Sequence, residues 1–175
     1  LADALAEPFA DAPERALVGE IGRQDDELLA APARNRAEAA HRVLQAHRDL
    51  LQDGIADLVI GSGGISAPFV RVVSGASGAV LRDFYAYDPG FTGGVYVAAA
   101  DITGDGFADI VTGAGPGGGP HVRVFDGVTG AAIPGPLAGF MAYDPAFGGG
   151  VRVAAGDVTG DGRADVITGP GPGGG

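Results

Sequence analysis

The sequence predicts an all-β fold, an array of repeated four-stranded antiparallel sheets preceded by a short α-helical segment. Three observations indicate this fold. One block of sequence recurs along the chain, each copy contains strand-forming runs separated by turn residues, and each copy carries a cluster of three aspartates.

The amino-terminal segment, residues 1–48, differs in composition from residues 49–175. It holds two of the 33 glycines and every glutamate of the chain. Residues 34–47 combine helix-forming residues with alanine, valine and leucine at roughly helical spacing. We therefore expect a helix over residues 34–47, within a segment that is otherwise helical or partly disordered.

Residues 49–175 form the repeat array. The tripeptide YDP at residues 87–89 recurs at residues 143–145, and Asp101 recurs as Asp157 with the same offset. Aligning Asp49 with Asp101 reveals a degraded copy upstream, in which "FVRVVSGASG" matches "HVRVFDGVTG". The full copy is longer than the degraded one by an insertion at residues 134–137. The array thus divides into a degraded copy at 49–100, a full copy at 101–156 and a truncated copy at 157–175.

Within the full repeat, strands are predicted over residues 95–99, 108–113, 121–125 and 137–143. Asp-Gly, Gly-Pro-Gly and "DGVTG" separate them. Four antiparallel strands in a repeat of this length match one blade of a β-propeller, whereas a parallel β-helix would need a far shorter period. Propellers close with about four to eight blades, and this array supplies little more than two. We expect a piece of a longer array; the alternative is that copies of the chain complete one another.

The charge distribution excludes several classes of partner. The net charge is −11 and lysine is absent, which argues against nucleic acid and anionic membranes. No apolar run is long enough to span a membrane, so no membrane insertion is expected. The absence of cysteine excludes disulfides and thiolate metal sites.

From residue 49 onward there are thirteen acidic residues, all aspartate. Nine of them fall in three clusters: Asp49, Asp53, Asp57; Asp101, Asp105, Asp109; Asp157, Asp161, Asp165.

The spacing D-x-T-x-D-G-x-x-D in the two later clusters predicts a calcium site. Ca²⁺ takes about six to eight oxygen ligands, and aspartates at positions 1, 5 and 9 of a tight loop can converge on one ion. A threonine at position 3 and a backbone carbonyl at position 7 can add oxygens, and glycine at position 6 permits the sharp turn. The alternative is a hairpin turn with solvated acids. The predicted ligands are Asp101, Thr103, Asp105, the Phe107 carbonyl and Asp109, and again Asp157, Thr159, Asp161, the Arg163 carbonyl and Asp165.

The first cluster is a weaker candidate. Leu51 replaces the threonine and Gln52 replaces a glycine, so one oxygen is lost and the loop is stiffer. Its corresponding ligand positions are Asp49, Asp53, the carbonyl of Ile55, and Asp57.

The segments "VAAADITGDGFADIVTGAG" and "VAAGDVTGDGRADVITGPG" resemble the FG-GAP repeats of integrin α-subunit propellers and their bacterial, VCBS-type relatives. The resemblance covers residues 49–175. It implies propeller blades, Ca²⁺ in the loop between the first two strands of each blade, and an extracellular or cell-surface setting. It also implies the ligand positions already given for the two later loops.

Other chemistry finds little support in the sequence. "GAGPGG" at residues 113–118 satisfies the dinucleotide-binding pattern G-x-G-x-x-G, but a strand is expected after it where that pattern needs a helix. No serine lies in a G-x-S-x-G context. His121 stands where the degraded copy has Phe69, which indicates a packing or surface position.

The sequence therefore predicts a non-enzymatic, calcium-binding repeat module of a secreted or surface protein, a scaffold for adhesion or for binding other proteins or surface glycans. Two alternatives stay open. The chain could be a self-assembling structural subunit, because open sheet edges favour self-association. It could also be an accessory region of a secreted hydrolase.

Overall fold

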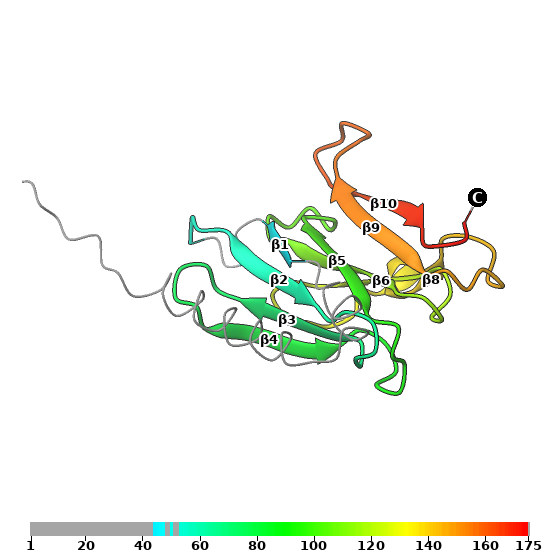
Figure 1. Ribbon diagram of the computed structural model, residues 1–175. Coiled ribbons are helices and arrows are strands. Elements are labelled where there is room, and N and C mark those ends of the chain that lie inside the picture. Colours follow the sequence, from blue (N-terminus) through cyan, green and yellow to red (C-terminus); the bar gives the residue numbers. More distant parts are fainter. Residues whose placement is uncertain (1–43, 48–49, 51–52, 175) are drawn as a thin grey trace, which may run out of the picture.

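The computed structural model describes residues 44–47, 50 and 53–174 (Figure 1). Antiparallel β-strands dominate this part of the chain, which confirms the predicted all-β fold. The elements are β1 (Leu44–His47), β2 (Asp57–Gly61), β3 (Phe69–Val73), β4 (Val80–Tyr85), β5 (Val95–Ala100), β6 (Asp109–Ala114), β7 (His121–Phe125), the 3₁₀ turn η1 (Gly135–Ala138), β8 (Phe140–Met141), β9 (Val151–Gly156) and β10 (Asp165–Pro170).

The strands form three sheets in chain order. Sheet 1 is β1-β2-β3-β4, sheet 2 is β5-β6-β7-β8, and sheet 3 is the pair β9-β10. Each strand of a sheet pairs antiparallel with the next one along the chain. The register repeats with the sequence: Val95 lies opposite Ala114 in sheet 2, and Val151, its counterpart in the next repeat, lies opposite Pro170 in sheet 3. The same local sequence therefore builds the same hairpin twice.

The prediction of a helix over residues 34–47 is wrong at its C-terminal end. Leu44–His47 form strand β1, in which Leu44 lies opposite Ile60 and His47 opposite Asp57. Pairing with β2 satisfies backbone groups along a whole strand, and such tertiary pairing overrides a weak local helical preference. Residues 34–43 lie outside the described part of the chain.

The fourth strand of the full repeat is shorter than the prediction over residues 137–143. The chain forms the 3₁₀ turn η1 and then only two strand residues, Phe140 and Met141. The cause is the insertion at residues 134–137. Its Pro136 lies in the first turn of η1 and lacks the N–H that a ladder needs. The three other strands predicted for this repeat correspond to β5, β6 and β7.

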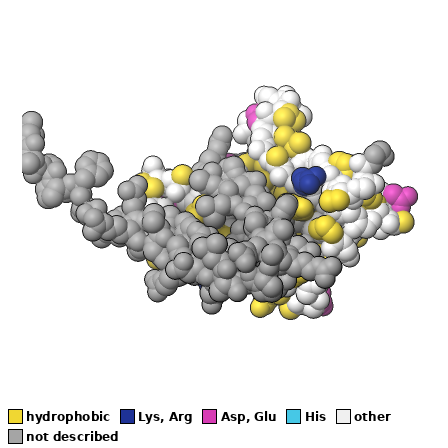
Figure 2. Space-filling model, viewed as in Figure 1, with side chains coloured by type: hydrophobic (Ala, Val, Ile, Leu, Met, Phe, Trp, Pro, Cys, Tyr) yellow, Lys and Arg dark blue, Asp and Glu magenta, His cyan; other side chains and the backbone are white. Residues whose placement is uncertain are grey.

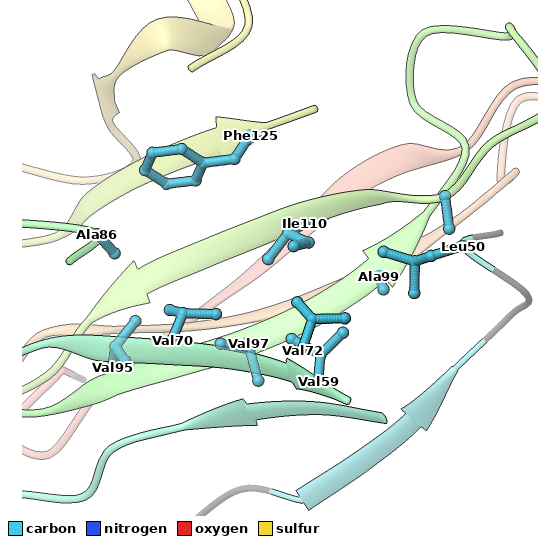
Figure 3. Close-up of a cluster of buried hydrophobic side chains, with 11 residues drawn as sticks. Leu50, Val59, Val70, Val72, Ala86, Val95, Val97, Ala99, Ile110 and Phe125 are labelled. Atoms are coloured by element: carbon cyan, nitrogen blue, oxygen red, sulfur yellow. The ribbon is translucent and has the colours of Figure 1, made fainter. Parts of the chain in front are cut away.

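Sheet 2 packs face to face against sheet 1. Figure 3 shows Val59, Val70 and Val72 of sheet 1 in one cluster with Val97 and Ile110 of sheet 2. These five side chains are fully buried. Val70 and Val72 come from alternate positions on their strand, which is the spacing that places side chains on one face of a sheet.

The other face of sheet 2 packs against sheet 3. Ala98, Val111 and Val124 of sheet 2 form a second buried cluster with Val151 and Val153 of sheet 3. Strand β6 is buried at all six of its residues. Sheet 2 is therefore the middle layer of a stack, with apolar side chains on both faces.

Two glycines at corresponding positions allow the sheets to approach closely. A Cβ atom built on Gly61 of β2 would lie 2.5 Å from the carbonyl oxygen of Val95, the first residue of β5. A Cβ atom on Gly113 of β6 would lie 2.3 Å from the carbonyl oxygen of Val151, the first residue of β9. Gly169 of β10 is the third glycine of this series, and no atom lies within 4 Å of its Cβ position. The second strand of a sheet thus needs glycine where the next sheet begins.

A tyrosine hydroxyl links each sheet to the next. The hydroxyl of Tyr87, which follows β4, lies 2.9 Å from the carbonyl oxygen of His121 and 3.1 Å from that of Thr112, both in sheet 2. Burial raises the pKa of Tyr87, so this hydroxyl keeps its proton for donation. The hydroxyl of Tyr143, the counterpart of Tyr87 in the next repeat, lies 3.2 Å from Thr168 Oγ1 of sheet 3.

Replacing Gly113 with alanine should destabilise the fold by about 1–3 kcal/mol, because the new methyl group would overlap a backbone oxygen that cannot move independently. The matched control is Gly169→Ala, which meets open space and should change stability by less than about 1 kcal/mol. The measurement is the free energy of unfolding in urea. Equal effects of the two substitutions would contradict the close approach at Gly113.

Candidate metal centre

The second aspartate loop, residues 101–109, joins β5 to β6 and is organised by its first aspartate. Asp101 Oδ1 accepts hydrogen bonds from the backbone N–H groups of Gly104 (2.6 Å) and Asp105 (3.1 Å). Asp101 Oδ2 accepts one from Gly106 (2.9 Å). Gly106 has a φ of 91°, in the left-handed region that favours glycine. One carboxylate thus folds the loop around itself.

The other two aspartates fasten the loop at its middle and its end. Asp105 Oδ1 accepts a hydrogen bond from the N–H of Phe107 at 2.8 Å. Asp109 begins β6, and its Oδ2 accepts the N–H groups of Ile102 and Thr103, both at 3.0 Å. Asp109 is 1% exposed, so the last aspartate lies beneath the loop rather than on its surface.

The third aspartate loop, residues 157–165, repeats this arrangement between β9 and β10. The Asp157 carboxylate accepts the N–H groups of Gly160, Asp161 and Gly162 at 2.6, 3.2 and 2.9 Å. The same three contacts of the second loop measure 2.6, 3.1 and 2.9 Å. Asp165 Oδ2 accepts two N–H groups from the start of the loop at 2.9 and 3.1 Å. This loop projects at the top of Figure 1, and Figure 2 shows acidic side chains on it.

Two oxygen atoms of the second loop are buried and have no partner within hydrogen-bond geometry, although the Thr103 hydroxyl lies close enough to Asp109 to lower the pKa of that carboxyl group. They are Thr103 Oγ1 and Asp109 Oδ1, at positions 3 and 9 of the predicted calcium motif. A buried carboxylate oxygen without a partner is costly, since it loses its water and gains nothing in return. A bound hard cation would satisfy both atoms, because Ca²⁺ prefers carboxylate and hydroxyl oxygens. The donor chemistry of this loop therefore fits the ion that the sequence predicts.

Burial also raises the pKa of the Asp109 carboxyl group. The N–H groups of Thr103 and Ile102 act in the opposite direction, the negative charge of Asp105 adds to the increase, and the nearby Thr103 hydroxyl lowers the pKa slightly. By contrast, the N–H groups of Gly162 and Gly160 hold the pKa of the exposed Asp157 below its usual value. Asp109 of the second loop and Asp157 of the third loop are thus electrostatically different, because burial dominates at the first and backbone N–H groups dominate at the second.

The described residues do not contain a ready-made cage of carboxylates. No group of three or more His, Asp or Glu side chains in this part of the chain is gathered closely enough to hold a metal ion. Asp101 and Asp105 direct carboxylate oxygens to backbone N–H groups of the loop, and Asp109 lies below them. The complete ligand set, including the carbonyls of Phe107 and Arg163, stays a prediction.

The Arg163 side chain is a feature of the site that the sequence did not indicate. Its Nε atom lies 2.6 Å from the position that a Cβ of Gly104 would take, so the third loop lies against the second. The N–H of Ala164 also donates to the carbonyl oxygen of Asp101 at 2.8 Å. A cationic side chain therefore lies beside the acidic loop of the preceding repeat. From the repeat alignment, the sequence predicted a role for the backbone carbonyl of Arg163 but none for its side chain.

The first aspartate loop differs from the other two. Asp49 lies outside the described residues, while Asp53 Oδ1 accepts the N–H of Ile55 at 3.0 Å, as in the later loops. Asp57 is fully buried, and both of its oxygens have partners: Leu50 N–H at 2.8 Å and Gly75 N–H at 3.1 Å. Because no oxygen of Asp57 is left without a donor, this loop lacks the feature that favours an ion in the second loop.

No protein-family model matches this chain, and no curated protein is significantly similar to it. Among the described residues, no helix is long and apolar enough to cross a membrane. The glycine string at residues 113–118 leads into strand β7 and not into a helix, as expected for a turn between strands.

Asp109 of the second loop and Asp157 of the third loop should titrate on opposite sides of their usual pKa of 3.8. In calcium-free buffer with chelator, Asp157 should titrate below it. Its contribution to stability is then present above pH 3.8 and is lost as the pH falls through the lowered pKa. Asp109 should titrate above 3.8, and its protonated form favours folding until the pH rises through the raised pKa. Carboxyl ¹³C NMR measures both; Asp109 titrating below Asp157 would contradict the assignment.

Proposed function

We propose that this chain is a non-enzymatic, calcium-stabilised repeat module of the FG-GAP type, in which sheets 1 and 2 are blades of a β-propeller and sheet 3 begins another. Its function is that of a scaffold for adhesion or for binding other proteins or surface glycans, in a secreted or cell-surface protein. The observation that carries the proposal is the pair of buried oxygens without partners, Thr103 Oγ1 and Asp109 Oδ1.

The stacking of the sheets supports the propeller arrangement. The strands of each four-stranded sheet follow chain order, and the first strand of sheet 2 contacts β1 and β2 of the sheet before it. Strand β9 contacts β5 and β6 of sheet 2 in the same way. A repeated contact between successive four-stranded sheets is the relationship that builds a propeller by radial repetition.

Calcium has a structural role in this proposal. Asp101, Thr103, Asp105, the carbonyl of Phe107 and Asp109 would hold the ion in the second loop, and the corresponding residues would hold it in the third. When bound, the ion supplies positive charge to three carboxylates of one short loop. The free energy of binding then becomes part of the free energy of folding, because the unfolded loop does not offer the assembled ligands.

Thermal unfolding followed by circular dichroism tests the proposal directly. With affinities on the order of 10⁻⁴–10⁻³ M, about 10 mM Ca²⁺ should stabilise the chain by about 1.4–2.7 kcal/mol per site relative to excess chelator. The same concentration of Mg²⁺ should not reproduce this effect, because Mg²⁺ requires a stricter octahedral geometry. Identical melts with Ca²⁺ and with chelator would overturn the calcium proposal and leave the aspartates as turn residues.

The substitution Asp109→Asn tests whether Asp109 binds calcium or only accepts hydrogen bonds from the loop backbone. Its amide oxygen can still accept the N–H groups of Ile102 and Thr103, so stability in chelator should change by less than about 1 kcal/mol. The calcium-dependent gain should fall by about half, since only the third loop would retain its full ligand set. The matched control is Asp57→Asn, which turns an amide N–H₂ group toward a backbone donor and should cost about 1–3 kcal/mol with or without calcium. A full calcium gain in Asp109→Asn would exclude that residue as a ligand.

Self-assembly is a second candidate function, favoured by the exposed face of sheet 3. Val158 and Ile167 are 69% and 42% exposed, whereas the corresponding Ile102 and Val111 are 9% and 0% exposed. The latter two belong to the cluster shared by sheets 2 and 3. Sedimentation velocity over a wide range of concentration should then show a rising mass, and Ile167→Asp should suppress the rise. A constant monomer mass would exclude this candidate.

A further inference from the structure

A hollow of about 390 Å³ lies at the junction of the three sheets, at the opposite end of the strands from the aspartate loops. Its wall includes Val95 and Tyr96, where β5 begins, whereas Asp101 follows the end of β5. Six strand residues at about 3.3 Å each separate the two ends by roughly 20 Å. A ligand in this hollow would not touch the predicted calcium ligands.

The wall of the hollow collects positions at which the repeats differ. Ile65 stands where the next repeat has Gly117, and Thr92 stands where it has Gly148. Tyr96 and Arg152 occupy one and the same repeat position, and both line the hollow. The position just before them is the same in both repeats: Val95 precedes Tyr96 and Val151 precedes Arg152. The side chains that give the hollow its chemistry are therefore ones that differ between the repeats.

Ile65 adopts a backbone conformation that is unfavourable for its residue type. It has a φ of 65° and is the one non-glycine residue of the described chain with a positive φ. A β-branched residue rarely enters this left-handed region, and Gly117, at the corresponding position, has a φ of 88°. The side chain is nevertheless 54% exposed, so burial does not offset the strain. Strained residues cluster at active sites and ligand-binding sites.

Among the described residues that line the hollow, Arg152 carries the one positive charge. The exposed Arg152 guanidinium lies 5.8 Å from the centre of the Tyr96 ring, and its Nη1 donates to the carbonyl oxygen of Pro170 at 3.2 Å. None of the described residues that line the hollow is acidic, although the chain carries a net charge of −11. A negatively charged group is therefore attracted here and repelled by most of the remaining surface.

We propose that this hollow binds an organic monocarboxylate with an apolar body. The carboxylate would receive charge-assisted hydrogen bonds from Arg152, and the apolar body would lie against Ile65 and the ring of Tyr96. The volume is within the range of about 300–1,000 Å³ usual for small-ligand sites. One guanidinium matches one carboxylate, whereas a doubly charged phosphate would call for a second cation. The proposal goes beyond the scaffold function and does not depend on calcium in the aspartate loops.

The test is an NMR titration of the full, ¹⁵N-labelled chain at constant Ca²⁺ with 3-phenylpropionate, and with its neutral amide as the matched probe. The acid should bind saturably and shift the backbone N–H signals of Gly63, Gly64 and Ile65. The amide should bind about tenfold more weakly, since it lacks the charge-assisted hydrogen bonds. Absence of saturable binding, or shifts confined to other parts of the chain, would overturn the proposal.

Variants separate the charged contact from the apolar one. Arg152→Gln should weaken the acid about tenfold and leave the amide unchanged. Ile65→Gly installs the residue of the second repeat, keeps the backbone conformation without strain, and should weaken both probes equally. Arg71→Gln removes an arginine whose ion pair with Asp83 lies outside the hollow, and should affect neither probe. Equal binding of acid and amide, unchanged by Arg152→Gln, would reject a carboxylate site.

A second arm identifies the source of the carboxylate. The peptide acetyl-Gly-Gly-Phe is titrated with a free and with an amidated C-terminus. Tighter binding of the free peptide than of 3-phenylpropionate supports the site with a peptide C-terminus as its ligand. Binding of 3-phenylpropionate alone supports the site with a small free acid as its ligand.

Discussion

The close approach of backbone to backbone between successive sheets is the constraint on which this structure depends. Sheet 2 can be covered on both faces only because the second strand of the preceding sheet has glycine where the first strand of the next sheet begins, at Gly61 and again at Gly113. Buried side chains, most of them valine or alanine, then fill the space on either side. Tyr87 and Tyr143 add hydroxyl contacts across the same junctions. The glycine content therefore reflects packing as well as turns.

The stack gives its two ends different properties. At one end lie the aspartate loops, whose last carboxylates stand at the start of β2, β6 and β10. Asp57 and Asp109 are buried there and Asp165 is half-buried. The same strand that buries Asp109 in the core thereby leaves one of its oxygens without a donor. At the other end, glycine-rich connections from different repeats meet around a hollow whose described lining includes Arg152. In the proposed function, calcium would act at the end with the aspartate loops and a ligand would bind at the end with the hollow.

The three aspartate loops show how repetition and divergence act together. The second and third loops make the same carboxylate contacts at nearly equal lengths, although the second loop is partly buried and the third is largely exposed. Their geometry is thus a local property of the aspartate motif. The first loop has lost the threonine, and its buried Asp57 instead receives a second N–H, from Gly75. Asp57 Oδ1 thus accepts a hydrogen bond, whereas the corresponding Asp109 Oδ1 of the second loop has no donor within hydrogen-bond geometry.

The sequence by itself determined the all-β class, three of the four strands in the full repeat and the aspartate loops, because these depend on local turn chemistry and a short period. It also identified the glycine at position 6 of the two later loops, whose backbone conformation few other residues adopt. Only the tertiary structure decided that Leu44–His47 form a strand, because the pairing partner β2 outweighs helical propensity. It alone brought Arg163 beside Gly104, and Ile65, Tyr96 and Arg152 to one hollow. Those contacts join different repeats, and no local pattern encodes which surfaces meet when sheets stack.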